Sequence, residues 1–116
     1  MAVIGLGYVG LPVACMLADA GFHVTGVDLK QERIEQINRG ESPIEGKEPG
    51  LAELLERVVD SNHLQATTHY ETLREAEIVL IDVETPIDED HIPQYHALKA
   101  ACNSLGPVLK EGALVV

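Results

Sequence analysis

The feature that most constrains this chain is a glycine-spaced turn close to its first residue. Three glycines, Gly5, Gly7 and Gly10, follow the apolar run of residues 1–4. Apolar side chains then recur at roughly helical spacing, at Val9, Val13, Leu17 and Ala20. This pattern predicts a strand, a tight turn and a helix that buries the apolar stripe.

Each glycine has a physical role in a turn that holds phosphate. Gly5 allows a sharp bend, Gly7 lets a pyrophosphate approach bare backbone, and Gly10 lets the helix pack close to the strand. The unpaired amides at the start of the helix, with the positive end of its dipole, favour an anion at this place. The alternative is a tight strand-to-helix turn that binds no ligand.

Asp28 supports a dinucleotide site. It ends a second predicted strand, residues 23–27, and follows Gly10 by 18 positions. That is close to the spacing of about 20 at which an acidic residue accepts the adenosine ribose hydroxyls. Because a carboxylate repels a 2′-phosphate, the sequence favours NAD over NADP. The alternative for Asp28 is an N-cap before a helix from Glu32 to Ile37.

Arg33 lies on the helix predicted over residues 30–38. Its guanidinium would lean toward the adenosine end of a dinucleotide, where a flat cation is useful. A solvated charge on the helix face is the alternative. Thr85-Pro86 follows a buried-type strand, residues 78–83, at the edge where ligands bind in open α/β sheets. The Thr85 hydroxyl is a candidate contact for the nicotinamide half, and a plain turn residue is the alternative.

The remaining pattern predicts an α/β fold. The clearest amphipathic helix carries Leu51, Leu54, Leu55, Val58 and Val59, and residues 48–50 open it. Further strands are expected at 64–68 and 113–116, and a last helix at 98–109. We expect a Rossmann-like doubly wound parallel sheet of about five strands, in an order like 3-2-1-4-5. Asp82, in an apolar strand, should lie near the strand's end or meet a donor.

Composition narrows the function classes. The net charge of −11 argues against a nucleic-acid or membrane-surface partner, because either would repel the chain. No segment resembles a signal peptide or a spanning helix, so a cytoplasmic location is expected. Cys15 and Cys102 fall in predicted helices and should pack as small buried hydrophobes rather than form a disulfide. The acidic residues 88–90 with His91 predict a solvated loop in preference to a metal site.

The chain stops in an apolar strand with no cap or tail. We therefore expect residues 1–116 to be one domain, truncated from a longer protein.

Several short motifs occur in order along the chain. They are the run Gly5 to Pro12, Val27-Asp28, Asn38-Arg39-Gly40 with Ser42-Pro43-Ile44, Glu48-Pro49-Gly50-Leu51, and Thr85-Pro86. Together they resemble the N-terminal NAD-binding domain of the nucleotide-sugar 6-dehydrogenases, which include the UDP-glucose, GDP-mannose and UDP-N-acetylmannosamine dehydrogenases. The stretch from Val83 to Asp88 is most similar to the members that act on UDP-N-acetylhexosamines.

The resemblance implies an NAD-dependent oxidation of a sugar C6 hydroxyl to a carboxylate in two hydride transfers, through a thiohemiacetal on a cysteine. It implies that Tyr8 and Val9 contact NAD through the turn and that Asp28 holds the adenosine ribose. Arg33 matches the family's basic residue near that ribose, and Thr85 its threonine beside the nicotinamide ribose. The family's catalytic cysteine, lysine and asparagine lie in motifs that this sequence lacks, so no catalytic residue is expected within it.

Two other functions use the same turn. One is a regulatory module that senses a dinucleotide without catalysis, and the other is a Rossmann-type hydroxy-acid dehydrogenase. The Glu-Pro-Gly-Leu and Thr-Pro segments favour the sugar dehydrogenase. On that interpretation, domains beyond this chain supply the nucleotide-sugar site, and the whole protein is a homo-oligomer.

Overall fold

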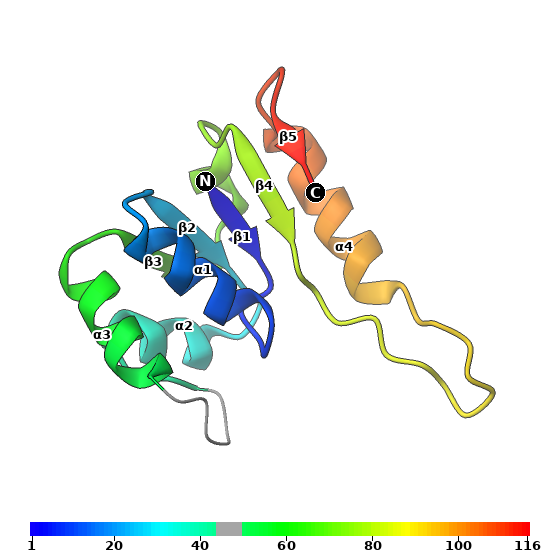
Figure 1. Ribbon diagram of the computed structural model, residues 1–116. Coiled ribbons are helices and arrows are strands. Elements are labelled where there is room, and N and C mark those ends of the chain that lie inside the picture. Colours follow the sequence, from blue (N-terminus) through cyan, green and yellow to red (C-terminus); the bar gives the residue numbers. More distant parts are fainter. Residues whose placement is uncertain (44–49) are drawn as a thin grey trace.

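The computed structural model describes residues 1–43 and 50–116 and has one sheet of five parallel strands (Figure 1). The strands are β1 (Ala2–Ile4), β2 (Val24–Val27), β3 (Leu64–Thr67), β4 (Ile78–Ile81) and β5 (Leu114–Val115). The helices are α1 (Gly10–Asp19), α2 (Gln31–Asn38), α3 (Leu51–Asp60) and α4 (His96–Leu105), with 3-10 turns η1 (Tyr70–Leu73) and η2 (Gly106–Val108). The order β3-β2-β1-β4-β5 confirms the predicted doubly wound topology.

The strand register brings the ends of three strands to one edge. Ile4 on β1 pairs with Val27 on β2 and with Ile81 on β4. The backbone continues this ladder by one step, because the Gly5 amide donates to the Val27 carbonyl at 2.7 Å and the Asp82 amide to the Ile4 carbonyl at 2.7 Å. The glycine turn therefore begins between the residues that follow β2 and β4.

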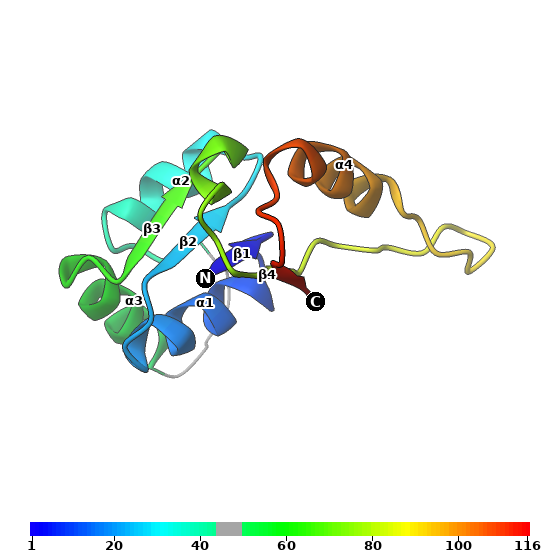
Figure 2. The same ribbon diagram turned by 90° about the horizontal axis from the view of Figure 1, so that it is seen from above.

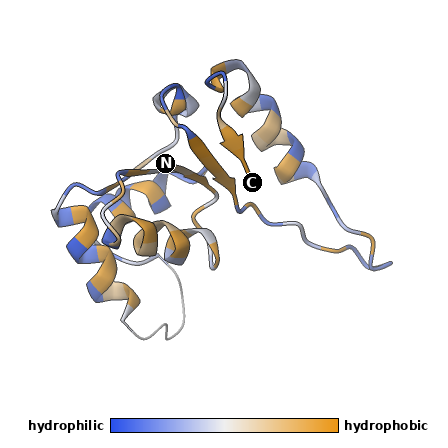
Figure 3. Ribbon diagram, turned by 45° about the horizontal axis from the view of Figure 1, so that its top comes forward, coloured by the Kyte–Doolittle hydropathy of each residue, from blue (hydrophilic) through white to orange (hydrophobic). Residues whose placement is uncertain are grey.

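Helices cover the sheet on both faces. Viewed from above, α1 and α4 lie on opposite sides of the strands (Figure 2). Strands β4 and β5 are coloured as hydrophobic, whereas the helices alternate between hydrophobic and hydrophilic residues (Figure 3). The larger core lies under α1, α2 and α3, and the smaller core lies under η1, α4 and η2.

Helix α1 buries a different stripe from the predicted one. Its buried residues are Gly10, Leu11, Ala14, Cys15 and Ala18. Val9, which the sequence pattern placed on the buried stripe, is 63% exposed at the N-cap. The reason is the turn, since Gly10 packs against the backbone of Gly5 and so fixes which side of the helix faces the sheet. The small side chains that follow at helical spacing let the helix lie close to the strands.

Helix α3 confirms the amphipathic prediction, because Leu51, Leu55 and Val58 are buried. Its predicted opening at Glu48-Pro49, like Ile44 of the motif series, lies outside the described residues. Gly50 is the N-cap, with a positive φ of 80° that suits glycine.

The region around β4 and α4 is less buried than expected. In β4 only Val79 is fully buried, because β4 neighbours a two-residue edge strand rather than a long one. Helix α4 buries Ala101 and Leu105 along a narrow stripe, and Cys102, which we expected to be buried, is exposed on its other side. Residues 83–95 form an arm that extends away from the sheet before α4 returns to it (Figure 1).

Candidate functional site

The glycine turn cannot be built with larger residues at two positions. Gly5 has φ of +95°, and a Cβ there would lie 2.6 Å from the Asp82 carbonyl oxygen. A Cβ at Gly10 would lie 1.7 Å from the Gly5 carbonyl oxygen. Because both contacts are with backbone, no side-chain rotation relieves them. The sequence-based roles of Gly5 in bending and Gly10 in close packing follow from these distances.

The outer part of the turn is open. A Cβ at Gly7 would have no heavy neighbour nearer than the Arg33 guanidinium, at 4.0 Å. Tyr8 is 64% exposed and Val9 63%. Within residues 1–43 and 50–116, the main-chain amides of Gly7, Tyr8 and Val9 donate no hydrogen bond. These free donors stand directly before α1, where the helix dipole favours negative charge.

Asp28 links this turn to helix α2. One carboxylate oxygen, Oδ2, accepts a hydrogen bond from the Leu6 amide at 2.9 Å and from the Arg33 guanidinium at 3.1 Å. The other, Oδ1, accepts one from the Lys30 amide at 3.1 Å. The N-cap of α2 is Lys30, without a side-chain cap bond, so Asp28 is not the helix N-cap that was its alternative. Its carboxylate instead fixes the turn relative to the end of β2.

This network keeps Asp28 ionised. Burial by itself would raise the pKa of the carboxyl, but the hydrogen bonds from the Leu6 and Lys30 amides and the nearby Arg33 charge outweigh it, and the pKa lies below its ordinary value. The Asp28 side chain is only 11% exposed and that of Arg33 25%. Asp28 therefore presents a fixed negative acceptor at neutral pH.

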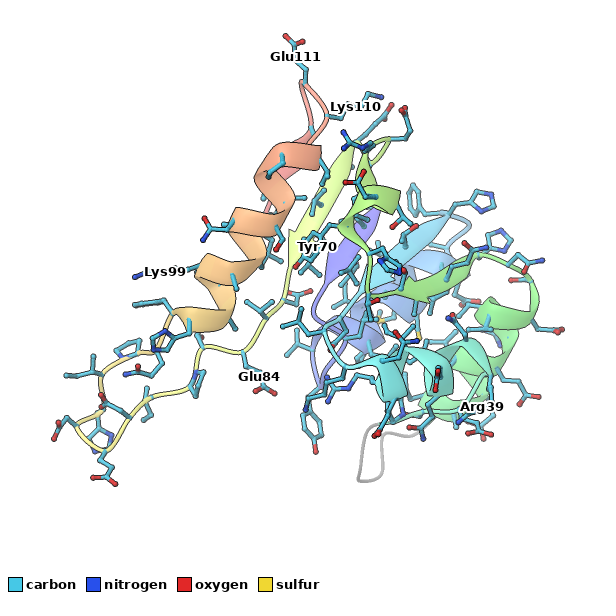
Figure 4. All side chains as sticks on the ribbon, turned by 180° about the vertical axis from the view of Figure 1, so that it is seen from behind. Arg39, Tyr70, Glu84, Lys99, Lys110 and Glu111 are labelled. Carbon is cyan, nitrogen blue, oxygen red and sulfur yellow. The ribbon has the colours of Figure 1, made fainter. Side chains whose placement is uncertain are left out.

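A pocket of about 390 Å³ opens along this edge of the sheet. Its lining from β1, β2 and the residues after them is Ile4, Gly5, Gly7, Tyr8, Val9, Val27, Asp28, Leu29, Lys30 and Arg33. Its lining from η1, the end of β4 and α4 is Tyr70, Asp82, Val83, Glu84, Ala97, Ala100, Ala101 and Ser104. Figure 4, which labels Tyr70 and Glu84, shows Glu84 at the root of the arm.

Most of the residues predicted from the sequence meet here. Gly5, Gly7, Tyr8, Val9, Asp28 and Arg33 all line the pocket, and Gly10 is buried against the turn. Thr85 does not line it and is exposed on the arm, one residue beyond Glu84. Asp82 follows the last residue of β4 and is partly buried, which confirms its expected place at the strand's end.

The sequence patterns did not single out several residues that line the pocket. Tyr70 lies on η1, and burial, followed by the nearby negative charge of Asp28, raises its pKa. Small residues on α4 form a low wall, namely Ala97, Ala100, Ala101 and Ser104. Their helical spacing was visible in the sequence, but only the fold shows that this helix faces the glycine turn.

The arm has a defined tip. The Asp88 carboxylate accepts hydrogen bonds from the Asp90 and Ile92 amides, both at 2.9 Å, and from the Gln94 side chain at 3.0 Å. Residues 88–91 are all exposed, as expected for a solvated loop. Both cysteines are free, with Cys15 buried and Cys102 exposed.

Comparison with known proteins identifies relatives over the full chain. A family described as "UDP-glucose/GDP-mannose dehydrogenase family, NAD binding domain" matches residues 1–116. The UDP-N-acetyl-D-mannosamine dehydrogenase of Salmonella typhi is 45% identical over 116 residues, which are 100% of this chain and 26% of that protein. The chain thus spans about a quarter of the length of the curated relatives it matches.

Solved structures agree with this result. The NDP-N-acetyl-D-galactosaminuronic acid dehydrogenase of Methanosarcina mazei superposes with a TM-score of 0.91 at 37% identity, covering 98% of this chain and 26% of that one. The GDP-mannose dehydrogenase of Pseudomonas aeruginosa, solved as a ternary complex, superposes with a TM-score of 0.85 at 32% identity, covering 90% and 24%. Within the described residues, no helix has the length and apolar character needed to cross a bilayer. The chain belongs to the NAD-binding domain of the UDP-glucose/GDP-mannose dehydrogenase family.

Proposed function

We propose that the pocket binds NAD across the glycine turn. The diphosphate lies on the free amides of Gly7, Tyr8 and Val9, and the adenosine ribose hydroxyls bond to Asp28. Arg33 lies beside that ribose, and Gly5 and Gly10 shape the turn. The observation that carries the proposal is an ionised, nearly buried carboxylate beside unpaired turn amides, both in one pocket.

The nicotinamide half extends toward the end of β4. A parallel sheet binds ligands across the point where the strand order reverses, which here lies between β1 and β4. Asp28 and Glu84 line opposite parts of the pocket, beyond β2 and β4 respectively. A dinucleotide with its ribose on Asp28 therefore directs its other half past Asp82 toward Thr85. Thr85 contacts the nicotinamide ribose once the arm lies against the pocket.

We propose further that residues 1–116 are the cofactor domain of a longer enzyme. Its activity is the oxidation of the C6 hydroxyl of a nucleotide sugar to a carboxylate, with UDP-N-acetylmannosamine or UDP-glucose as candidate substrates. The support is the family, the names of the relatives, and the fact that they are about four times as long. Converting a hydroxyl to a carboxylate removes four electrons, so each turnover delivers two hydrides to two NAD molecules. The groups that activate the sugar lie outside this chain.

The cellular setting is part of the same proposal. An exposed free thiol at Cys102 suits a reducing compartment, so we place the enzyme in the cytoplasm. The charge of −11 supports a protein that binds neither nucleic acid nor an anionic membrane surface. We expect the whole enzyme to be a homo-oligomer, which light scattering of the longer protein would test.

Calorimetric titration with NAD tests the binding site. Asp28→Ala should weaken NAD binding by about tenfold or more, because it removes the ribose acceptor and frees the turn from β2. Asp60→Ala is the matched control, since Asp60 is an exposed carboxylate at the end of α3, outside the pocket. Equal NAD affinity in the Asp28→Ala variant and the parent would overturn the ribose assignment.

A further inference from the structure

The β4 side of the pocket carries an excess of negative charge. Among the described residues that line it from η1, the end of β4 and α4, Asp82 and Glu84 are acidic and none is a lysine, arginine or histidine. On the β2 side, by contrast, the acidic lining residue Asp28 is paired with Arg33, and Lys30 also lines that side. The uncompensated carboxylates of the pocket therefore lie beyond β4.

Asp82 stands close to the glycine turn. The place of a Cβ on Gly10 is 3.3 Å from the Asp82 Cβ, so the Asp82 side chain lies beside the first residue of α1. Asp82 is partly buried, whereas Glu84 is exposed at the root of the arm (Figure 4). In the part of the chain that the structure describes, neither carboxylate has an ion pair or a hydrogen bond. No paired cation offsets their charges toward a ligand in the pocket.

These two charges do not help to hold a diphosphate, because like charges repel. They act differently on the nicotinamide ring, which the proposed binding mode directs past Asp82. The ring carries a positive charge in NAD⁺ and none in NADH, whereas the diphosphate is the same in both. An anionic wall beside the ring therefore attracts the ring of the oxidised cofactor and gives no such attraction to that of the reduced one.

We propose that Asp82 and Glu84 make the pocket select the oxidised cofactor, so that NAD⁺ binds more tightly than NADH. This inference rests on the proposed function, because it assumes that the nicotinamide half lies on the β4 side. Selection of this kind suits an enzyme that transfers two hydrides in one turnover. After the first transfer NADH must leave and a second NAD⁺ must take its place, and the two carboxylates favour both parts of that exchange.

The alternative is that the two acids act only on the diphosphate and weaken every anionic nucleotide alike. In that case NAD⁺, NADH and ADP-ribose, which has the same diphosphate but no nicotinamide ring, gain equally when the carboxylates are neutralised. The ratio of NAD⁺ affinity to NADH affinity separates the two roles, because the contribution of the diphosphate cancels in that ratio.

The test measures the affinities of NAD⁺, NADH and ADP-ribose by calorimetry for the parent, Asp82→Asn, Glu84→Gln and the double variant. The amides keep the shape of each side chain and remove its charge. We expect the ratio of NAD⁺ to NADH affinity to fall about threefold in each single variant and about tenfold in the double variant. NADH and ADP-ribose should gain affinity together, and added salt should lower the ratio of the parent.

Asp60→Asn is the matched control, because it removes one negative charge at the exposed end of α3, outside the pocket. It should leave the ratio unchanged. Circular dichroism monitors the fold, and if Asp82→Asn does not fold, the exposed Glu84→Gln carries the test. An unchanged ratio in every folded pocket variant overturns the selection of the oxidised cofactor, as does an equal fall in Asp60→Asn. Failure of the parent to bind NAD⁺ overturns the proposed function instead.

Discussion

The two halves of the pocket are built differently. On the β2 side, Asp28 joins the turn, the end of the strand and helix α2 through three hydrogen bonds. On the β4 side, the chain leaves the sheet after Asp82 as an arm on which residues 84–93 are all exposed. The first half is fixed by its own contacts, whereas the second half has its internal hydrogen bonds near the arm's tip, away from the pocket.

This difference suggests a division of work. In the NAD-binding mode that we propose, the preorganised β2 side of the pocket holds the adenosine half and loses little entropy on binding, so we expect it to supply affinity. The arm on the β4 side must be ordered by contacts with other groups, because its own hydrogen bonds lie near its tip. We therefore expect the adenosine part of NAD to account for most of the affinity of this chain, and changes on the two sides to have unequal effects.

Gly10→Ala should have the largest effect. Its new methyl group would lie 1.7 Å from the Gly5 carbonyl oxygen, so the helix must move off the strand. We expect a loss of about 3 kcal/mol or more in unfolding free energy, with loss of NAD binding. Gly106→Ala is the control, since a Cβ there meets nothing within 4 Å and its φ of −47° suits alanine. Equal melting temperatures for the two variants would contradict the close packing of α1.

Acid should weaken the adenosine half through Asp28. Because folding lowers the pKa of this carboxyl, its contribution to stability is present above the ordinary value of 3.8 and is lost as the pH falls below that value toward the folded pKa. Asp28→Asn should lower stability at neutral pH by about 1–3 kcal/mol. It should also lose less stability than the parent on acidification, as measured by urea unfolding at several pH values. Parallel pH profiles for the two proteins would refute the ionised network.

The arm offers the contrasting change. Asp88→Ala removes the acceptor for two amides and the Gln94 side chain at the tip. Because these groups are exposed, global stability should fall by less than about 1 kcal/mol, while hydrogen exchange at residues 90 and 92 accelerates. The affinity for 5′-ADP should not change. A clear loss of 5′-ADP binding would break the division between the two halves.

The smallest expected effect is a difference between the labelling rates of the two cysteines, which changes neither stability nor affinity. Burial raises the pKa of the Cys15 thiol on α1 to about 11, whereas Cys102 is exposed on α4. A thiol reagent at neutral pH should label Cys102 promptly and Cys15 only after unfolding. Mass spectrometry after timed labelling distinguishes the two sites. Labelling of Cys15 at the same rate would show that the core under α1 opens readily.

Local patterns in the sequence predicted the structure on the β2 side of the pocket well. The glycine turn, the Asp28 position and the amphipathic stripe of α3 all depend on residues close together in sequence, so spacing alone reveals them. The predicted buried face of α1 was offset by about one residue from the observed one. The observed face depends on the contact between Gly10 and the Gly5 backbone, which residue spacing does not encode.

The other half was harder to predict for a physical reason. Tyr70, in the connection from β3 to β4, and the α4 wall, in the connection from β4 to β5, reach the pocket only because the chain crosses over the sheet, and no local pattern marks them. The exposure of Cys102 depends on how much of α4 the short edge strand covers. Thr85 was singled out by its motif, and its contact with the cofactor stays a prediction.

A crystal structure with NAD bound tests the central claim most directly. We expect the diphosphate within hydrogen-bond distance of the amides of Gly7, Tyr8 and Val9, with the adenosine ribose hydroxyls on the Asp28 carboxylate. A diphosphate bound elsewhere, or a turn occupied by a side chain while NAD is present, would contradict it.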